Sequence, residues 1–103
     1  MIAGDDVLRH LRARRDQIVA KLVEFASIPS VSTDPAYARP VNEAAQWLAE
    51  RLKRAGLDHV TIHKTPGHPI ITAHWLKAKG APTVLVYGHY DVQPPDPVDA
   101  WKS

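Results

Sequence analysis

The sequence has 103 residues, no cysteine, 45% hydrophobic residues and a formal charge of +2, which together are typical of one small globular domain. The small positive surplus does not predict a nucleic-acid-binding surface, and the lack of cysteine leaves only histidine and carboxylate side chains as metal ligands. Because no apolar run is long enough to span a bilayer and the first residues lack the apolar core of a signal peptide, we expect a cytoplasmic protein without nucleic-acid or membrane partners.

The first part of the chain predicts one amphipathic helix from about residue 5 to residue 26. Apolar positions recur at steps of three and four, with Arg15 in the one remaining slot of the stripe. The apolar residues of this stripe are Leu8, Leu11, Ile18, Leu22 and Phe25. Asp5 and Asp6 can accept hydrogen bonds from the free amide groups of the first turn, and Pro29 ends the helical pattern.

Residues 27–40 contain three prolines and several serine and threonine residues, which predicts a loop anchored by Ile28 and Val31. The helical period returns from about Pro40 to Ala55 and predicts a second amphipathic helix. Gly56 follows at the position where a residue in the left-handed conformation closes a helix. No internal repeat or linker divides the chain into two domains.

After this helix the pattern changes to a period of two, which indicates β-strands. Three runs fit this pattern, at residues 60–63, 69–77 and 82–88. The last run is apolar almost throughout from Thr83 to Tyr87, which is typical of a central strand covered on both faces of an α/β sheet. The sequence therefore predicts an α/β fold in which two helices are followed by three strands.

Two polar residues, His89 and Asp91, stand at the carboxyl end of this central strand, where functional groups gather in α/β sheets. With one residue between them, both side chains project from the same face of an extended chain, and the carboxylate can reach one ring nitrogen. Such a contact fixes the imidazole tautomer and directs the other nitrogen toward a metal ion. This predicts His89 as a metal ligand oriented by Asp91. The alternative is a surface histidine paired with a neighbouring acid, because an isolated His-x-Asp pair is common.

The neighbouring Tyr90 is expected to point to the opposite face and pack. His59 and His63 have the spacing of a helical zinc pair, but in a strand that spacing separates them by about 13 Å, so they cannot share one ion. The remaining histidines are expected to be helix-surface, turn and strand-face residues, at His10, His68 and His74 respectively.

The segment VLVYGHYDVQPPDP, residues 84–97, resembles the first metal-binding segment of the di-zinc metallopeptidase family that includes carnosine dipeptidases, aminoacylases, succinyl-diaminopimelate desuccinylases and carboxypeptidase G. FASIPSVS and AAQWLAERLKRAGL are also similar to the dipeptidase-like branch of this family. The resemblance implies a zinc-exopeptidase-like catalytic domain with a larger mixed sheet, of which residues 1–103 are the amino-terminal portion. It also implies that His89 binds one of two zinc ions, or another divalent metal, and that Asp91 is a catalytic-site residue that orients it.

The function implied by this resemblance is hydrolysis of an amide bond in a dipeptide or related small peptide by a homodimeric enzyme. An N-acyl amino acid deacylase is the alternative within the same enzyme class. Because the family's remaining ligands, general base and lid domain lie farther along the chain than Ser103, we expect these residues alone to be inactive. The alternative of a different class is a non-catalytic binding or interaction module that uses an exposed sheet edge.

Overall fold

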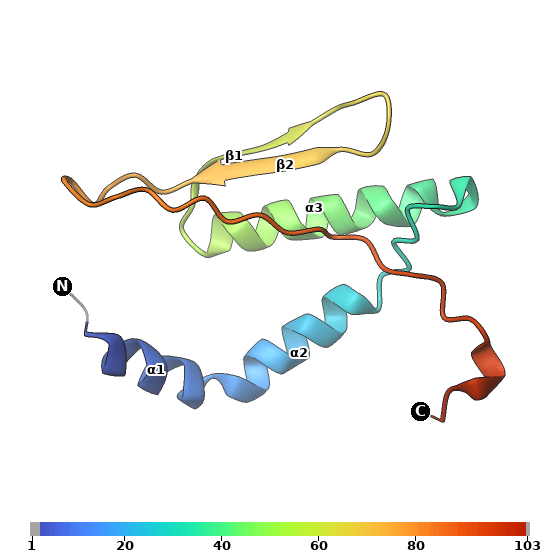
Figure 1. Cartoon of the computed structure of the whole chain (residues 1–103), viewed down its shortest axis with the longest axis horizontal. Coiled ribbons are helices and arrows are strands. Elements are labelled where there is room, and N and C mark those ends of the chain that lie inside the picture. The colour runs from blue at the N-terminus through green and yellow to red at the C-terminus, as the bar shows by residue number, and fades with distance from the viewer. Residues whose placement is uncertain (1–2, 103) are drawn as a thin grey trace.

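One helix packed against a β-hairpin forms the centre of the structure, a computed structural model that describes residues 3–102 (Figure 1). The two strands of the hairpin are antiparallel, with Thr61 opposite Thr72 and a register shift near the start of the first strand. Alternate residues of both strands are half-buried on the side of the helix, as the period of two predicts. The three elements are α3 at Ala38–Arg54, β1 at Asp58–His63 and β2 at Ile70–His74.

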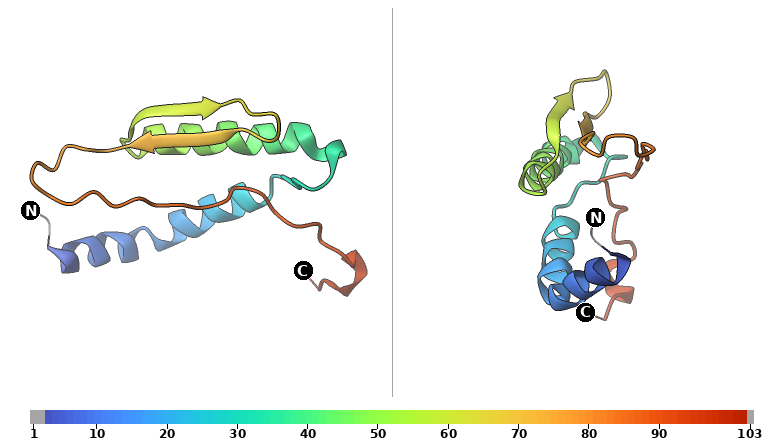
Figure 2. Two further views of the ribbon diagram at one scale, coloured as in Figure 1. Left: turned by 45° about the horizontal axis from the view of Figure 1, so that its top comes forward. Right: turned by 90° about the vertical axis from the view of Figure 1, so that its left-hand side faces the viewer.

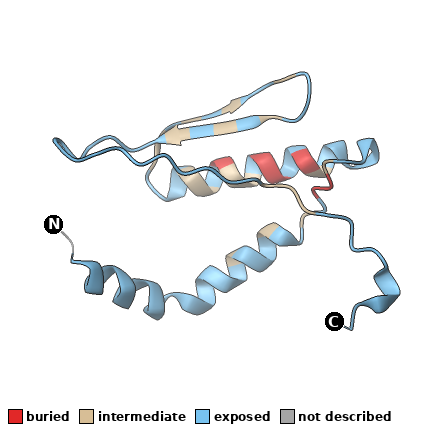
Figure 3. Ribbon diagram, in the orientation of Figure 1, coloured by how far each residue is buried: buried red, intermediate tan, exposed pale blue. Residues whose placement is uncertain are grey.

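A stripe of small side chains on α3 forms most of the core (Figure 3). Its spacing of three and four residues places all of its members on one side of the helix, where the hairpin covers them. Because three of the four are alanines, the hairpin can lie close to the helix backbone. The buried residues of the stripe are Val41, Ala44, Ala45 and Ala49.

The second predicted helix and its cap are confirmed, since α3 has bounds close to the expected Pro40 and Ala55. Gly56 adopts a φ of 89°, in the left-handed region that glycine enters without strain. Its amide donates to the carbonyl of Lys53, and the amide of the next residue, Leu57, donates to the carbonyl of Leu52. This pair of hydrogen bonds satisfies the last helix carbonyls and turns the chain directly into β1.

The prediction of one continuous helix over residues 5–26 is wrong, because two helices occupy this region (Figure 2). Their bounds are α1 at Gly4–Ala13 and α2 at Arg15–Ala26. The backbone of Arg14 between them leaves the helical region, with φ −107° and ψ 11°. The physical reason is the charged run at residues 12–16, which offers no apolar side chain larger than alanine to keep the two helices collinear. No helix within residues 3–102 combines the length and apolarity needed to cross a membrane.

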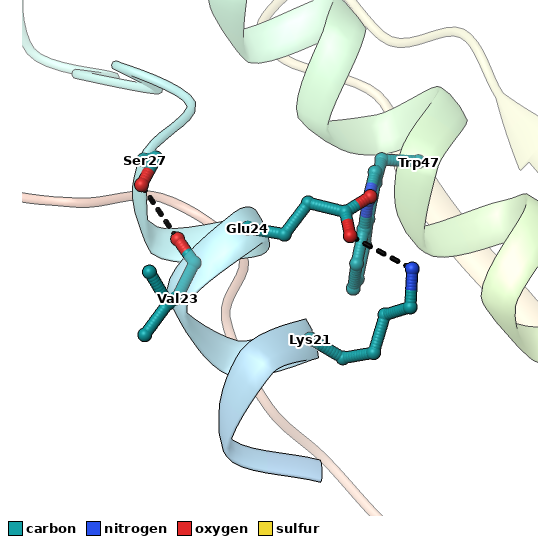
Figure 4. Close-up of polar contacts among 5 residues, drawn as sticks. All are labelled: Lys21, Val23, Glu24, Ser27 and Trp47. Atoms are coloured by element: carbon teal, nitrogen blue, oxygen red, sulfur yellow. Dashed lines mark hydrogen bonds and ion pairs between the residues drawn. The ribbon is translucent and has the colours of Figure 1, made fainter. Parts of the chain in front are cut away.

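The end of α2 is attached to α3 through Trp47 (Figure 4). The rings of Phe25 and Trp47 are stacked with their centroids 4.8 Å apart, and the indole Nε1 donates to a carboxylate oxygen of Glu24 at 2.8 Å. The ammonium group of Lys21 binds the other oxygen at 2.8 Å. Hydrogen bonds from Lys21 and then from Trp47 lower the pKa of the Glu24 carboxyl. The attachment thus combines an aromatic contact with a charged one at a single point.

The predicted central strand at Thr83 to Tyr87 is not formed, and this prediction is wrong in detail although the α/β class is confirmed. The segment runs as an extended chain past α3 (Figure 2). Its side chains are not covered on either face, since the exposed fraction is 80% for Val84, 91% for Leu85 and 86% for Val86. A strand forms only where a neighbour satisfies its amides and carbonyls, and within residues 3–102 no strand lies beside this segment.

We expect the substitution Val41→Ala to lower the free energy of unfolding by about 2 kcal/mol, because it removes buried methyl groups from the α3 stripe. The control Val84→Ala makes the same chemical change at a side chain that is 80% exposed and should have almost no effect. Urea titrations followed by circular dichroism measure both values. Equal effects of the two substitutions would contradict the placement of the core.

Candidate functional site

A cavity of about 490 Å³ lies between α3, the start of β2 and the extended segment that leads to Asp91. Ile70 and Ile71 of β2 and Val86 of the extended segment contribute to a mainly apolar wall. Besides two tyrosines, four polar side chains line it, and they come from three separate parts of the chain: Ser32, His68, His89 and Asp91. The cavity therefore combines apolar surface with a few convergent polar groups, which is typical of small-molecule sites.

The two predicted site residues, His89 and Asp91, are in contact at the rim of this cavity. The ring Nδ1 of His89 lies 2.7 Å from Oδ1 of Asp91, and the side chains are 79% and 40% exposed. Because an ionised carboxylate only accepts hydrogen bonds, Nδ1 carries the proton in this contact and Nε2 is left as the free nitrogen of the neutral ring. The structure brings the pair together, and the role of each residue stays a prediction.

A third side chain, Ser32, completes the contacts of the carboxylate but is not among the predicted site residues. Its hydroxyl donates to Oδ2 of Asp91 at 2.6 Å, across a sequence separation of 59 residues. This hydrogen bond, followed by the one from His89, lowers the pKa of the Asp91 carboxyl. The only sequence signal for Ser32 is its place in a loop with a partly apolar anchor, and such a loop does not reveal which distant residue it meets.

Residues 30–32 and 90–92 are joined by backbone contacts that fix the position of Asp91. Ser30 is fully buried, and its hydroxyl donates to the carbonyl of Tyr90 at 3.1 Å. The amide of Val92 donates to the carbonyl of Ser30 at 3.0 Å, and Val31 and Val92 form a parallel bridge. These bonds place the carboxylate next to the loop that carries Ser32.

The turn between the two strands of the hairpin also contributes to this region. Tyr90, which is predicted to pack, is half-buried, and its hydroxyl donates to the carbonyl of Pro69 at 2.6 Å. Burial, and to a smaller extent the charge of Asp91, raises the pKa of this phenol. His68 lies in the turn, as expected, and its Nε2 donates to the carbonyl of Ser32 at 2.8 Å. The turn is therefore bonded to both segments that hold the carboxylate.

The other histidines lie outside this site. The rings of His59 and His74 are stacked with centroids 4.7 Å apart across the hairpin, and Nε2 of His63 lies 2.7 Å from the hydroxyl of Thr72. Over the part of the chain that the structure describes, no three histidine, aspartate or glutamate side chains are close enough together to hold a metal ion. Among the histidines of residues 3–102, only His89, the predicted ligand, both contacts a carboxylate and lines the cavity.

Proteins with similar sequences include dipeptidases and succinyl-diaminopimelate desuccinylases. The chain is 29% identical to the Cys-Gly metallodipeptidase DUG1 of Saccharomyces cerevisiae, a match that covers 94% of this chain and 23% of that protein. It is 36% identical to the cysteinylglycine-S-conjugate dipeptidase of Corynebacterium striatum, over 91% of this chain and 21% of that protein. It is 35% identical to the succinyl-diaminopimelate desuccinylase of Stenotrophomonas maltophilia, over 78% of this chain and 19% of that protein.

The fold is also similar to that of a solved dipeptidase structure. The structure of the dipeptidase Dug1p from Saccharomyces cerevisiae superposes with a TM-score of 0.82, at 29% identity, over 94% of this chain and 22% of that chain. No protein-family model matches the chain. The chain thus spans about a fifth of the length of the proteins that it matches.

The lowered pKa of Asp91 predicts that its contribution to stability depends on pH. A carboxyl whose pKa is lower in the folded state stabilises the fold at pH values above its unfolded pKa of about 3.9, and this contribution is lost as the pH falls through the folded pKa. Urea titrations should therefore show Asp91→Asn to be less stable than wild type at neutral pH, with the difference closing below about pH 4. The control Asp99→Asn, at an exposed acid, should follow wild type at both pH values. A difference for Asp91→Asn that is constant with pH would contradict the charged contact.

Proposed function

Because the chain belongs to the metallopeptidase family that includes the Cys-Gly dipeptidases and the succinyl-diaminopimelate desuccinylases, we propose that the protein hydrolyses the amide bond of a dipeptide. The observation that carries this proposal is the similarity to a dipeptidase structure over nearly the whole of this chain. Residues 1–103 then form the amino-terminal portion of a catalytic domain. The His89–Asp91 contact at a cavity supports the same assignment.

We assign His89 as a metal ligand and Asp91 as the residue that orients it. The donor chemistry fits zinc, because the carboxylate accepts from Nδ1 and leaves Nε2 free, as in many zinc sites with a carboxylate behind the ligating histidine. A catalytic zinc ion normally needs three protein ligands, and the described residues supply no cluster of three. We propose that other residues of the full-length protein supply the remaining ligands and the general base, and we expect residues 1–103 to be inactive by themselves.

Each group in the site has a separate part in the proposed reaction. Zinc, proposed here as a pair of ions, would supply Lewis-acid polarisation of the scissile carbonyl and a water of lowered pKa. His89 presents Nε2 as a ligand, and Asp91 holds the proton at Nδ1 so that the ring keeps this tautomer. Ile70, Ile71 and Val86 give the cavity an apolar wall against which an apolar part of a substrate can pack.

A second candidate within the same class is removal of an acyl group from an amino acid. Four relatives named succinyl-diaminopimelate desuccinylase match 78% of this chain at 31% to 35% identity. Both reactions hydrolyse an amide bond, so the roles proposed for His89 and Asp91 are the same in each. The dipeptide is preferred because the dipeptidase relatives match a larger share of this chain.

A non-catalytic interaction module is the candidate of a different class. The observation in its favour is the exposed apolar segment that includes Val84 and Leu85. Homodimer formation, a cytoplasmic location and the absence of nucleic-acid or membrane partners stay predictions.

We expect His89→Ala, in the full-length protein loaded with zinc, to reduce hydrolysis of Cys-Gly by more than about 100-fold, because it removes a metal ligand. Removal of the metal with a chelator should abolish hydrolysis, and added zinc should restore it. The control His10→Ala, at an exposed position of α1, should leave the rate unchanged. Parallel assays with N-succinyl-diaminopimelate distinguish the two amide substrates. Full activity of His89→Ala would contradict the assigned ligand, and hydrolysis of neither substrate by the zinc-loaded wild type would favour the interaction module.

A further inference from the structure

We propose that Ser32 is a positioning residue of the site, which holds the carboxylate of Asp91 in the plane that His89 requires. The importance of Ser32 for catalysis rests on the proposed function. Its effect on the orientation of Asp91 rests only on the observed hydrogen bonds. Oδ2 of Asp91 accepts from the Ser32 hydroxyl at 2.6 Å while Oδ1 contacts Nδ1 of His89 at 2.7 Å. Each carboxylate oxygen thus has its own fixed partner.

A carboxylate with only one partner does not fix the orientation of a histidine ring. The terminal torsion of aspartate has a broad, roughly two-fold energy profile, so the carboxylate group can rotate and exchange its two oxygens. A second short hydrogen bond to the other oxygen restricts this rotation, because both contacts can form in only one plane of the carboxylate. Ser32 therefore fixes that plane and the direction in which the carboxylate accepts from His89.

Ser32 can have this effect because the loop that carries it is itself held in place. Its carbonyl accepts from Nε2 of His68, and the adjacent Val31 is buried and bridged to Val92. Ser30, in the same loop as Ser32, is fully buried, and its hydroxyl donates to the carbonyl of the distant Tyr90. The hydroxyl of Ser32 is thus presented to the carboxylate from a fixed backbone rather than from a freely moving loop.

The alternative is that Ser32 merely ties two segments of the chain together. Ser30 provides the matched control, because its hydroxyl also joins residues 30–32 to residues 90–92 but contacts a backbone carbonyl and not the carboxylate. If each serine only joins the two segments, removal of either hydroxyl should have a similar effect on the tautomer of His89. Loss of a positioning contact should change His89 only when the hydroxyl of Ser32 is removed.

The experiment measures the tautomer of His89 by nitrogen NMR in the full-length, metal-free protein, labelled with ¹⁵N at histidine and assigned with His89→Gln. The spectra are recorded at a pH where the ring is neutral, so that titration does not contribute. We expect the wild type to hold the proton at Nδ1, and Ser32→Ala to raise the Nε2-protonated population about fivefold, the effect of losing one ordinary hydrogen bond. Ser32→Thr, which keeps the hydroxyl, should restore the wild-type tautomer. Folded Ser30→Ala should leave it unchanged, because the amide of Val92 still donates to the carbonyl of residue 30 and Ser32 still binds Asp91.

If the His89 ring of the wild type carries its proton mainly at Nε2, the proposal is overturned by that measurement alone. The test therefore does not depend on the folding of Ser32→Ala. An unchanged tautomer in folded Ser32→Ala, or an equal change in Ser30→Ala, would also overturn it. Zinc titration of the same proteins gives a second readout, in which Ser32→Ala should bind about 10-fold more weakly than Ser30→Ala. If the tautomer of His89 responds as expected but neither the wild type nor any variant hydrolyses Cys-Gly, the proposed function fails. In that case the role of Ser32 in orienting Asp91 still stands.

Discussion

The hydrogen bonds between residues 30–32 and 90–92 are the constraint on which the site depends. They join positions about sixty residues apart in sequence, through the hydroxyl and carbonyl of the fully buried Ser30. Closing a loop of this length has an entropic cost that grows slowly with its length, so a few well-placed bonds can offset it. Without them, the chain after β2 would have no fixed position relative to α3, and Asp91 would have no fixed position relative to the cavity.

The apolar core alone is too small to supply this constraint. Its buried side chains are Val31, Val41 and three alanines of α3, which bury little apolar surface because alanine carries only one methyl group. Polar contacts around Tyr90 and His68 add to it by linking the hairpin turn to both segments that hold the carboxylate. Since the hydroxyl of Ser30 lies where water cannot reach it, its bond to Tyr90 is costly to break. The site is therefore built on polar contacts at the edge of a small core.

Local sequence patterns predicted the elements whose causes are local. The helical period of apolar residues predicts α3, Gly56 predicts its cap, and alternation predicts the two strands of the hairpin. The contact of His89 with Asp91 also follows from a separation of two residues along an extended chain. The break at Arg14 is not predicted, because the helical pattern of apolar residues continues on both sides of it and does not show that the charged run at residues 12–16 interrupts the helix.

Features that depend on distant residues could not be predicted in this way. The contact of Ser32 with Asp91 requires two loops to meet, and no period or motif in either loop encodes the other. The strand expected at Thr83 to Tyr87 shows the converse error. Its apolar composition predicts burial, but burial and pairing both require a neighbouring strand, and within residues 3–102 no strand lies beside it.

His89 lies between a segment whose side chains are exposed and a segment that is hydrogen-bonded to residues 30–32. On its amino-terminal side the side chains of Val84 and Leu85 are almost fully exposed, whereas on its carboxyl side Asp91 is held by residues 30–32. The imidazole is itself largely exposed, so packing does not determine its orientation. Its one short polar contact within the described residues is with Asp91, and the orientation of Asp91 depends in turn on Ser32. The direction in which Nε2 points is therefore determined from the carboxyl-terminal side of the ring, by a carboxylate that is itself held by Ser32.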